Sequence, residues 1–432
     1  MKHFFLYSFL FLQVFSLEAQ LYFPPNNTNE WETITPETLN WCPDKIEELY
    51  QYLANNDTKA FILLKDGKIV LEQYFDGFTA ESNWYWASAG KTLTAVVTGI
   101  AQQEGFLNIN DATSNYLGTG WTSCTPTQEA AITVWHQLTM TSGLDDGVAD
   151  PYCTDPTCLQ YLADPGTRWA YHNGPYTLLD GVIENATGQT LNTYTQQKVK
   201  NVTGMNGLYV PSGYNNVYWS TPRSMARFGL LILNEGNWDG TQIITNSNYF
   251  NQMVNTSQDL NKSYGYLWWL NGKESFMLPS LQTVFPGPLF TNAPEDMISG
   301  LGADGQFVNV IPSQNMVWIR MGEDPSGVPV PYLLNNEIWG YINEFECNLN
   351  TQNDTENTVT LYPNPVTNVV YLSSHKELTN ATFQLYTSLG QLVQKGTFKN
   401  NTSIIVQNLP HGLYFITLTA ETGTQTLRFV KD

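Results

Sequence analysis

The stretch Trp84-Tyr85-Trp86-Ala87-Ser88-Ala89-Gly90-Lys91 runs directly into an apolar segment, residues 92–104, which is predicted to be a helix that ends at Gly105. Ser88 and Lys91 are three residues apart, so their side chains share one face at the helix start, about 5–6 Å apart at Cβ. The free N–H groups and the dipole of a helix start favour negative charge. Desolvation by apolar neighbours lowers the pKa of a lysine, and the neutral amine can accept a serine proton.

A second candidate element, Tyr171-His172-Asn173, follows about 80 residues later. A tyrosine beside a lysine ammonium has its phenolate favoured, which suits proton transfer to a leaving group. The Asn173 amide can orient both the lysine and a carbonyl group. S-x-x-K and Y-x-N are weak patterns when taken singly, because most such residues lie in ordinary loops. They become informative together because the Y-x-N pattern follows the S-x-x-K pattern by about 80 residues.

Composition restricts the class of protein. At 432 residues the chain is longer than a typical single domain, and its 42% hydrophobic content suffices for a large core. Only 13% of residues are charged, and 19 Lys+Arg stand against 39 Asp+Glu, a net charge of −20. This balance argues against a nucleic-acid partner and against docking on anionic lipid.

The N-terminus is typical of an exported protein. Lys2 and His3 precede a mostly apolar run, residues 4–17, and Ala19 offers a small residue for cleavage. We interpret residues 1–19 as a signal peptide. A membrane anchor is the alternative, but the run is shorter than the ~20 residues that a spanning helix needs. The mature chain, from residue 20, is predicted to have no transmembrane anchor.

Export permits disulfides, and the chain has five cysteines. Cys153 and Cys158 have four residues between them in a loop of Asp, Pro and Thr. Further zinc ligands at finger-like spacing are missing nearby, so a local disulfide is favoured over a metal site. Because five is odd, at least one thiol stays free or pairs with another chain. Cys124 is the candidate, although it could compete for Cys153 or Cys158.

The distribution of predicted elements indicates an α/β (α+β) fold. Strands predicted at 60–64 and 69–75 flank Asp66-Gly67, a strong hairpin signal. Helices and long loops fill about 110–260, including an amphipathic helix at 222–233. Strands return at 265–270, 307–311 and 316–321, and a last helix covers about 333–345. We expect one antiparallel sheet flanked by helices and completed by both ends of residues 20–347, with an inserted helical subdomain.

The composition changes after residue 347. Residues 348–358 are polar and are interpreted as a linker. Short alternating strands with turns between them then predict a small all-β sandwich over residues 359–432. The strands are expected at 359–362, 369–372, 382–386, 391–396, 403–406, 412–419 and 426–430.

This C-terminal segment resembles the sorting domain of the type IX secretion system. The resemblance rests on Leu361-Tyr362-Pro363-Asn364-Pro365, on the stretch at 385–391, on Leu413-Tyr414-Phe415 and on Arg428-Phe429-Val430-Lys431. It implies a partner, the type IX secretion machinery, and a secreted or cell-surface location beyond both bacterial membranes. A carbohydrate-binding or adhesive sandwich is the alternative.

Residues 36–347 resemble the β-lactamase-related serine hydrolases, which include class C β-lactamases, D-alanyl peptidases, carboxylesterases and nylon-oligomer hydrolases. The ordered motifs carry this resemblance, together with the stretch at 138–144, the Pro-Gly before the tyrosine and Ser220-Thr221-Pro222-Arg223. It implies Ser88 as nucleophile, Lys91 as base and Tyr171 as acid/base partner with Asn173. The interpretation involves no cofactor and no metal.

Such proteins carry a third element, K-T-G or H-x-G, on an edge strand, and the aligned stretch here is Gly302-Ala303-Asp304-Gly305-Gln306. In this alignment Gly305 is retained, and the N–H groups of Gln306 and Ser88 would form the oxyanion hole. Ala303 stands where a cation is usual, and Asp304 would repel a substrate carboxylate. The resemblance therefore predicts hydrolysis of a small-molecule or peptide ester or amide and makes true β-lactamase activity doubtful.

Other catalytic interpretations fit the sequence less well. The chain has no G-x-S-x-G motif. A serine triad would need His136 or His172, and His136 is predicted to be structural. The main alternative is a non-catalytic or weakly active surface binding protein of the same fold, which the altered third element motivates. An adhesin with an incidental S-x-x-K requires the ordered matches to be chance.

The expected fold has two further consequences. A first helix is predicted at 43–53, before the first strand, and the last helix follows the last strand. If those two strands are antiparallel neighbours, the two helices are antiparallel as well, and the start of the first meets the end of the last. Cys42 would then pair with Cys347. Such a disulfide closes a loop of ~300 residues and would contribute on the order of 5 kcal/mol in the chain-entropy model. In the predicted strand at 265–270, Tyr266 and Trp268 share one face. A core role is favoured for both over an aromatic wall of the cleft.

Overall fold

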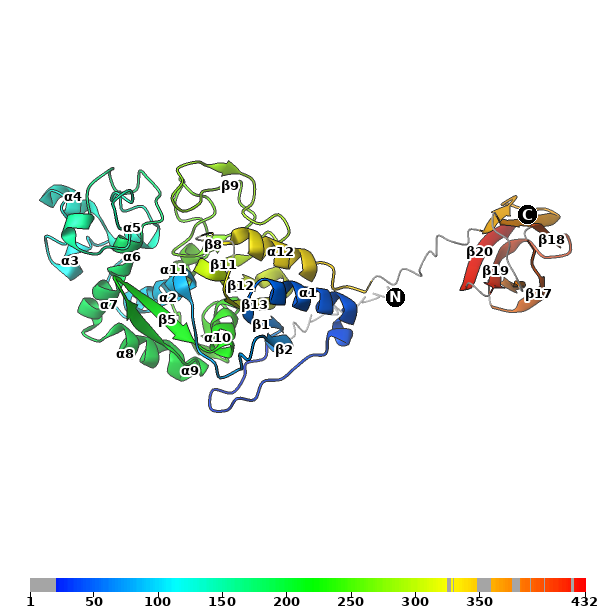
Figure 1. Ribbon diagram of the computed structural model, residues 1–432, viewed down its shortest axis with the longest axis horizontal. Coiled ribbons are helices and arrows are strands. Elements are labelled where there is room, and N and C mark those ends of the chain that lie inside the picture. The colour runs from blue at the N-terminus through cyan, green and yellow to red at the C-terminus, as the bar shows by residue number, and fades with distance from the viewer. Residues whose placement is uncertain are drawn as a thin grey trace, which may run out of the picture. The chain divides into compact units, whose positions relative to one another are not determined.

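The computed structural model describes residues 21–324, 328, 330–347, 359–374, 381–388, 390–399, 401–420 and 423–432. The predicted signal peptide and linker lie outside these ranges. The chain divides into two compact units, with the boundary in the sequence after residue 347 (Figure 1). Each unit is described by itself.

The first unit is built on a six-stranded antiparallel sheet in the order β2-β1-β13-β12-β11-β8. The hairpin at Asp66-Gly67 joins the first two strands, and both residues have positive φ, 51° and 81°. Strands from the two ends of the unit therefore lie side by side in the middle of the sheet, as predicted. The strands are β1 (Thr58–Lys65), β2 (Lys68–Tyr74), β8 (Trp269–Leu270), β11 (Ile298–Gly302), β12 (Gln306–Ile311) and β13 (Met316–Gly322).

Helices cover both faces of this sheet. In β13, Val317 and Trp318 point to opposite faces because side chains alternate along a strand. Gly229 of α10 (Pro222–Leu233) lies so close to Val317 that an added Cβ would be 2.4 Å from its Cγ1. Trp339 of α12 (Tyr332–Ile342) packs against Trp318 on the other face, with 6.0 Å between ring centroids. Figure 1 shows α1 (Pro43–Asn55) beside α12, and the two are in contact.

Along the chain, the predicted helical insertion comes after β2 and before β8, and α2 (Lys91–Gln103) leads into it. A small sheet in the order β3-β5-β4 packs with the insertion. The remaining helices are α3 (Ser114–Leu117), α4 (Pro126–Ala131), α5 (Val134–Leu138), α6 (Asn173–Thr177), α7 (Leu179–Thr187), α8 (Leu191–Thr195), α9 (Asn201–Thr203) and α11 (Ser247–Met253). The shorter strands are β3 (Trp84–Tyr85), β4 (Leu208–Ser212), β5 (Asn215–Ser220), β6 (Asn237–Trp238), β7 (Thr241–Gln242), β9 (Ser275–Phe276) and β10 (Phe285–Pro286).

One predicted strand is mostly a turn. Of residues 265–270 only Trp269 and Leu270 form β8. Gly265 N–H donates to the Trp268 carbonyl at 2.9 Å, and Leu267 has a φ of 62°, which interrupts the alternation. Tyr266 and Trp268 are both buried, as the core role predicts.

The structure contains both predicted disulfides. Cys42 is bonded to Cys347, 305 residues away, and Cys153 is bonded to Cys158. Cys124 is the free cysteine, as predicted. The Cys42–Cys347 bond joins the start of α1 to the segment that follows α12. The same two segments are also linked by a hydrogen bond from Cys42 N–H to the Phe345 carbonyl, 2.7 Å.

The second unit is the predicted all-β sandwich. Its two sheets have the orders β14-β15-β18 and β17-β16-β19-β20, and they enclose a separate core that includes Val370, Leu385, Ile416 and Phe429. All seven expected strands are present, with shifts of up to three residues at their ends. They are β14 (Val359–Tyr362), β15 (Val369–Ser374), β16 (Thr382–Thr387), β17 (Leu392–Thr397), β18 (Asn401–Ile405), β19 (Gly412–Ala420) and β20 (Gly423–Lys431).

Candidate active site

Ser88 and Lys91 lie where the chain enters α2. Ser88 belongs to a single 3-10 turn, η2 (Ala87–Gly90), and Lys91 is the first residue of the α-helix. Ala87 has a φ of 45°, a conformation that few residues other than glycine adopt, directly before the serine. The turn is held by a hydrogen bond from Ala89 N–H to the Trp86 carbonyl, 3.0 Å.

The two side chains are hydrogen bonded. Lys91 Nζ donates to Ser88 Oγ at 2.9 Å, and the lysine is only 5% exposed. Burial lowers the pKa of Lys91 to about 7, against a weaker opposing effect of the Asp180 carboxylate. The Lys91 amine lies near two aromatic rings, with Nζ 5.2 Å from the Tyr171 ring centroid and 4.3 Å from that of Tyr176. A substantial share of Lys91 is therefore a neutral amine at neutral pH.

Tyr171 joins this pair. Its side chain is buried, and its hydroxyl is near enough to Ser88 for that side chain to influence its pKa. Burial raises the pKa of Tyr171 well above its usual range, and the effect of Ser88 opposes this only in part. The phenolate that the sequence favoured is therefore not the resting form. Tyr171 holds its proton at neutral pH and can donate it.

Asn173 and the two histidines play different parts. Asn173 is 8% exposed, and its Oδ1 has no hydrogen-bond partner among the described residues. His172 is buried and its pKa is lowered by burial to about 4, so it is neutral. His136 closes a capping box with Thr133, whose Oγ1 lies 2.9 Å from His136 Nδ1, in agreement with the predicted structural role.

The third element has to be reassigned by three residues. Gly302, the last residue of β11, lies against the serine turn, since an added Cβ would be 2.5 Å from the Trp86 carbonyl oxygen and 3.0 Å from Ala89 N. An added Cβ at Gly305 would instead be 2.2 Å from Arg320 Nη1. The Gln306 side chain binds the backbone of Gly322, with distances of 2.6 and 3.1 Å. Gly305 and Gln306 therefore belong to the β11–β12 turn and its support.

The reassignment also moves the expected cation position. In a K-T-G element that ends at Gly302, the lysine would occupy position 300, which is a glycine. Gly300 packs against Thr92 of α2, with an added Cβ 3.1 Å from Thr92 Cγ2. Asp304, whose φ is 59°, accepts a hydrogen bond from the Tyr85 hydroxyl at 2.7 Å. The cation is still missing, and Asp304 has a partner of its own.

Sequence reasoning missed two residues near Lys91, the buried Tyr176 and the half-buried Asp180. Tyr176 lies in α6, three residues after Asn173, and its hydroxyl is 3.2 Å from Thr94 Oγ1. Asp180 lies in the first turn of α7, and its Oδ2 accepts from Asn216 Nδ2 at 3.1 Å. Burial raises the pKa of Asp180 to about 7. Helical spacing from Asn173 could have pointed to Tyr176, but Asp180 carries no such signal.

Comparison with known proteins agrees with this geometry. The beta-lactamase family model matches residues 55–330, well over half of the chain. The chain belongs to the beta-lactamase family. None of the curated protein sequences matches it.

Several solved structures are similar in fold to this beta-lactamase family member. They include a putative 6-aminohexanoate-dimer hydrolase from Bacillus anthracis, with a TM-score of 0.55 and 19% identity over 74% of this chain and 88% of that one. A putative beta-lactamase from Bacteroides dorei gives 0.54 and 16% over 70% and 97%. A family VIII carboxylesterase gives 0.51 and 15% over 69% and 98%. At these identities the likeness shows the fold.

The C-terminal unit of this beta-lactamase family member also matches a known model. Residues 360–432 match the secretion system C-terminal sorting domain. This domain marks the protein for export by the type IX system to the cell surface or beyond, as predicted. In the part of the chain that the structure describes, none of the helices has the length and apolar character that crossing a membrane requires.

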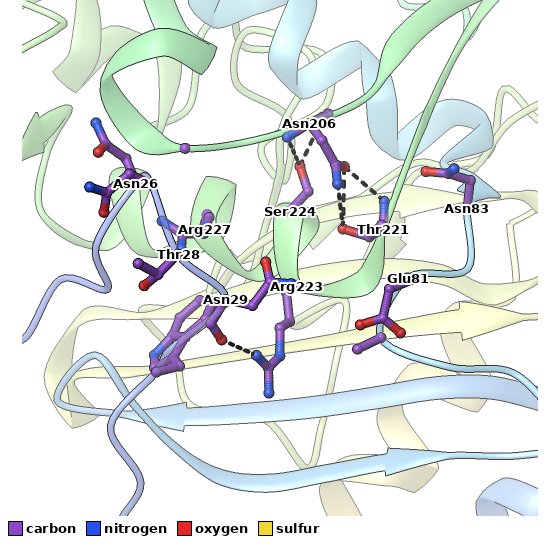
Figure 2. A pocket seen from close by; sticks show the side chains of 14 residues that line it. Asn26, Thr28, Asn29, Glu81, Asn83, Asn206, Thr221, Arg223, Ser224 and Arg227 are labelled. Carbon is purple, nitrogen blue, oxygen red and sulfur yellow. Dashed lines mark hydrogen bonds between the residues drawn. The ribbon is translucent and has the colours of Figure 1, made fainter.

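A polar pocket of about 400 Å³ lies apart from Ser88, Lys91 and Tyr171. Figure 2 shows Arg223 reaching toward Asn29, whose carbonyl it binds at 2.6 Å. The same guanidinium binds Glu72, and Arg227 donates to the carbonyls of Pro24, Pro25 and Thr203. These arginines fasten the N-terminal segment to the beta-lactamase-like unit, so their donors serve the fold.

Proposed function

We propose that the protein is a secreted serine hydrolase that forms an acyl-enzyme at Ser88 and hydrolyses an ester or an amide. One observation carries the proposal. Ser88 Oγ is hydrogen bonded at 2.9 Å to Nζ of Lys91, a buried lysine whose pKa burial lowers to about 7. A base with a pKa near the working pH is the most effective proton acceptor.

The proposed acylation uses four residues of the site, which are Ser88, Lys91, Tyr171 and Ala303. The Lys91 amine accepts the Ser88 proton while Oγ attacks the carbonyl carbon, and the carbonyl oxygen becomes an oxyanion. The N–H of Ser88 and the N–H of Ala303, which follows Gly302, would stabilise that oxyanion. The Tyr171 hydroxyl gives its proton to the departing oxygen or nitrogen and regains one from the Lys91 ammonium. Water then attacks the Ser88 ester, with the same groups as base and acid.

The substrate is proposed to lack the carboxylate of β-lactams and D-alanyl peptides. Position 300, where the family's third element carries a cation, is a glycine. Two proteins of similar fold are a family VIII carboxylesterase and a putative 6-aminohexanoate-dimer hydrolase, which supports a reaction other than β-lactam hydrolysis. Asn173 Oδ1, a buried acceptor without a partner among the described residues, would orient a donor of the substrate.

Labelling combined with a substrate panel tests the proposal. A fluorophosphonate should attach to Ser88, and the Ser88→Ala variant should not be labelled. Ser247→Ala, which changes an exposed serine at the start of α11, should be labelled normally. p-Nitrophenyl esters should turn over faster than nitrocefin or D-alanyl peptides. Stoichiometric labelling without turnover on the whole panel would favour the non-catalytic binding protein, and folded protein that takes no label would contradict the proposed hydrolase.

A further inference from the structure

A loop that we call the mouth loop, Asp145 to Cys158, lies against the second element of the candidate site. The Pro151 carbonyl accepts a hydrogen bond from Gly174 N–H at 2.9 Å. The Cys153 carbonyl is so close to Gly174 that an added Cβ would lie 2.4 Å from it. Gly174 directly follows Asn173, and the Cys153–Cys158 disulfide closes the loop at this contact. The mouth loop therefore flanks the place where a substrate would meet Asn173.

The charge of this region has one sign. Residues 144–167 contain five aspartates and no lysine, arginine or histidine. Arg168 follows and pairs with Asp146 at 2.6 Å. Asp145, Asp150 and Asp155 have no ion pair with a cation in the described part of the chain. Their described hydrogen bonds come from backbone N–H groups and from a tyrosine hydroxyl, so their negative charge is not neutralised.

Two tyrosine rings stand exposed among these carboxylates. Tyr152 is 44% exposed and Tyr214 is 41% exposed. The Tyr214 hydroxyl donates to Asp155 Oδ2 at 2.8 Å, and Tyr152 N–H donates to Asp150 Oδ1 at 2.9 Å. Tyr152 is also near enough to Tyr171 to contribute to the raised pKa of that hydroxyl. An aromatic face next to a carboxylate attracts ammonium groups through both the ring and the charge.

A separate observation at the same place concerns Asn173. Its Oδ1 is a buried acceptor without a hydrogen-bond partner among the described residues. Buried acceptors are normally satisfied, so this atom calls for a donor from a ligand. The unpartnered acceptor of Asn173 is therefore next in the chain to Gly174, which the acidic mouth loop contacts, while the cation that would hold a carboxylate is missing at position 300.

We propose that the ester or amide cleaved at Ser88 carries an ammonium group, which binds between the exposed rings of Tyr152 and Tyr214 and the carboxylates of Asp150 and Asp155. This inference rests on the proposed function, because it concerns the substrate of the same serine. It assigns the mouth loop as the specificity-determining segment. It also gives a second physical reason, charge repulsion, for discrimination against anionic substrates.

Two substrate series with matched shape test the inference. The first contains p-nitrophenyl esters of 4-(trimethylammonio)butanoate, of its neutral isostere 5,5-dimethylhexanoate and of glutarate. The second compares butanoate esters of choline and of 3,3-dimethylbutanol, which places the charge on the leaving side. In at least one series the cationic substrate should have a kcat/KM on the order of tenfold above its neutral isostere. The gap should shrink in 1 M NaCl, and the glutarate ester should be slowest.

Variants locate the effect. In Asp150→Asn/Asp155→Asn, which retains the hydrogen-bonding shape, the ratio of kcat/KM for the cationic ester to kcat/KM for its neutral isostere should fall to within about twofold. Asp239→Asn, in the distant β6–β7 turn, should change neither value. Equal rates for cation and isostere in both series, fastest hydrolysis of glutarate, or a preference unchanged in the double variant would each overturn the inference. Loss of neutral-ester hydrolysis in Ser88→Ala shows separately that the proposed function holds.

Discussion

The helical side of the candidate site is formed by residues close together in the sequence, whereas its strand side depends on contacts between distant segments. Ser88 and Lys91 lie within one turn of chain, and their hydrogen bond spans three residues. Gly302 is the last residue of β11, and the turn that follows it contacts the segment before Ser88. The hydrogen bond there, between Tyr85 and Asp304, joins residues 219 positions apart. Helix geometry alone sets the first arrangement. The second depends on where β11 ends and how it pairs with β12, since a small shift in register moves side chains to other positions.

The largest expected effect breaks the helical side at its nucleophile. Ser88→Ala should lower kcat/KM for a p-nitrophenyl ester by at least about a thousandfold, because no acyl-enzyme can form. Thermal unfolding should be nearly unchanged, since the serine is only half-buried. Activity that stays within tenfold of the parent protein would show that Ser88 is not the nucleophile. Ser247→Ala serves as the matched control.

The next effect concerns the base. Lys91→Met keeps the length and apolar stem of the side chain but removes the amine, so kcat should fall by about 10²–10⁴-fold. Burial of a methionine thioether in place of a desolvated amine should not destabilise the fold. Lys45→Met, at an exposed lysine paired with Glu48 and Glu344, should leave kcat unchanged. If both variants behave alike in steady-state assays, Lys91 has no role in proton transfer.

A pair of glycine variants tests the strand side and its reassignment. Gly302→Ala places a methyl group 2.5 Å from the Trp86 carbonyl, so the strand must move away from Ser88 and kcat should fall at least about tenfold. Gly305 has a φ of 77° and an added methyl group would meet Arg320, so Gly305→Ala should cost about 1–3 kcal/mol of stability. Its kcat per folded molecule should stay close to that of the parent. The opposite pattern would restore the original alignment on Gly305.

The smallest effect on activity is expected from the Cys42–Cys347 disulfide. Cys42→Ser/Cys347→Ser should lower the free energy of unfolding by up to about 5 kcal/mol, because the bond closes a loop with a sequence separation of 305. The kcat of folded protein should stay within about twofold.

The Cys153→Ser/Cys158→Ser variant should show the reverse, with little loss of stability and a changed KM, because this bond shapes the mouth loop. Denaturant titrations and initial rates measure both quantities.

The same contrast explains what the sequence predicted well. The sheet, both disulfides and the seven strands of the sandwich followed from hydrophobic alternation, turn residues and the spacing of cysteines, which are local signals or consequences of strand adjacency. Ser88 and Lys91 were placed by helical spacing. The third element was displaced by three residues because Gly302 and Gly305 are equally plausible glycines in a sequence, and only the packing of β11 against the serine turn distinguishes them.

Two other details also depended on long-range packing. The expected strand at 265–270 was mostly a turn, because Leu267 takes a positive φ within a buried aromatic cluster. Tyr171 was expected to favour its phenolate, but burial of the side chain raises its pKa instead. Asp180 comes near Lys91 only through the packing of α2 and α7. Burial of a charged or polar group is a property of the folded surroundings, which no short motif reports.

The central claim is that a neutral Lys91 amine accepts the proton of Ser88, and the pH dependence of fluorophosphonate labelling tests it most directly. Burial lowers the pKa of Lys91 to about 7, so the ammonium form, which cannot accept a proton, dominates below that pH. The labelling rate at Ser88 should rise with pH, reach half its maximum near pH 7 and level off above it, and Lys91→Met should lose this midpoint. A rate that is flat from pH 5 to 9 in folded protein, or a label on another residue, would contradict the claim.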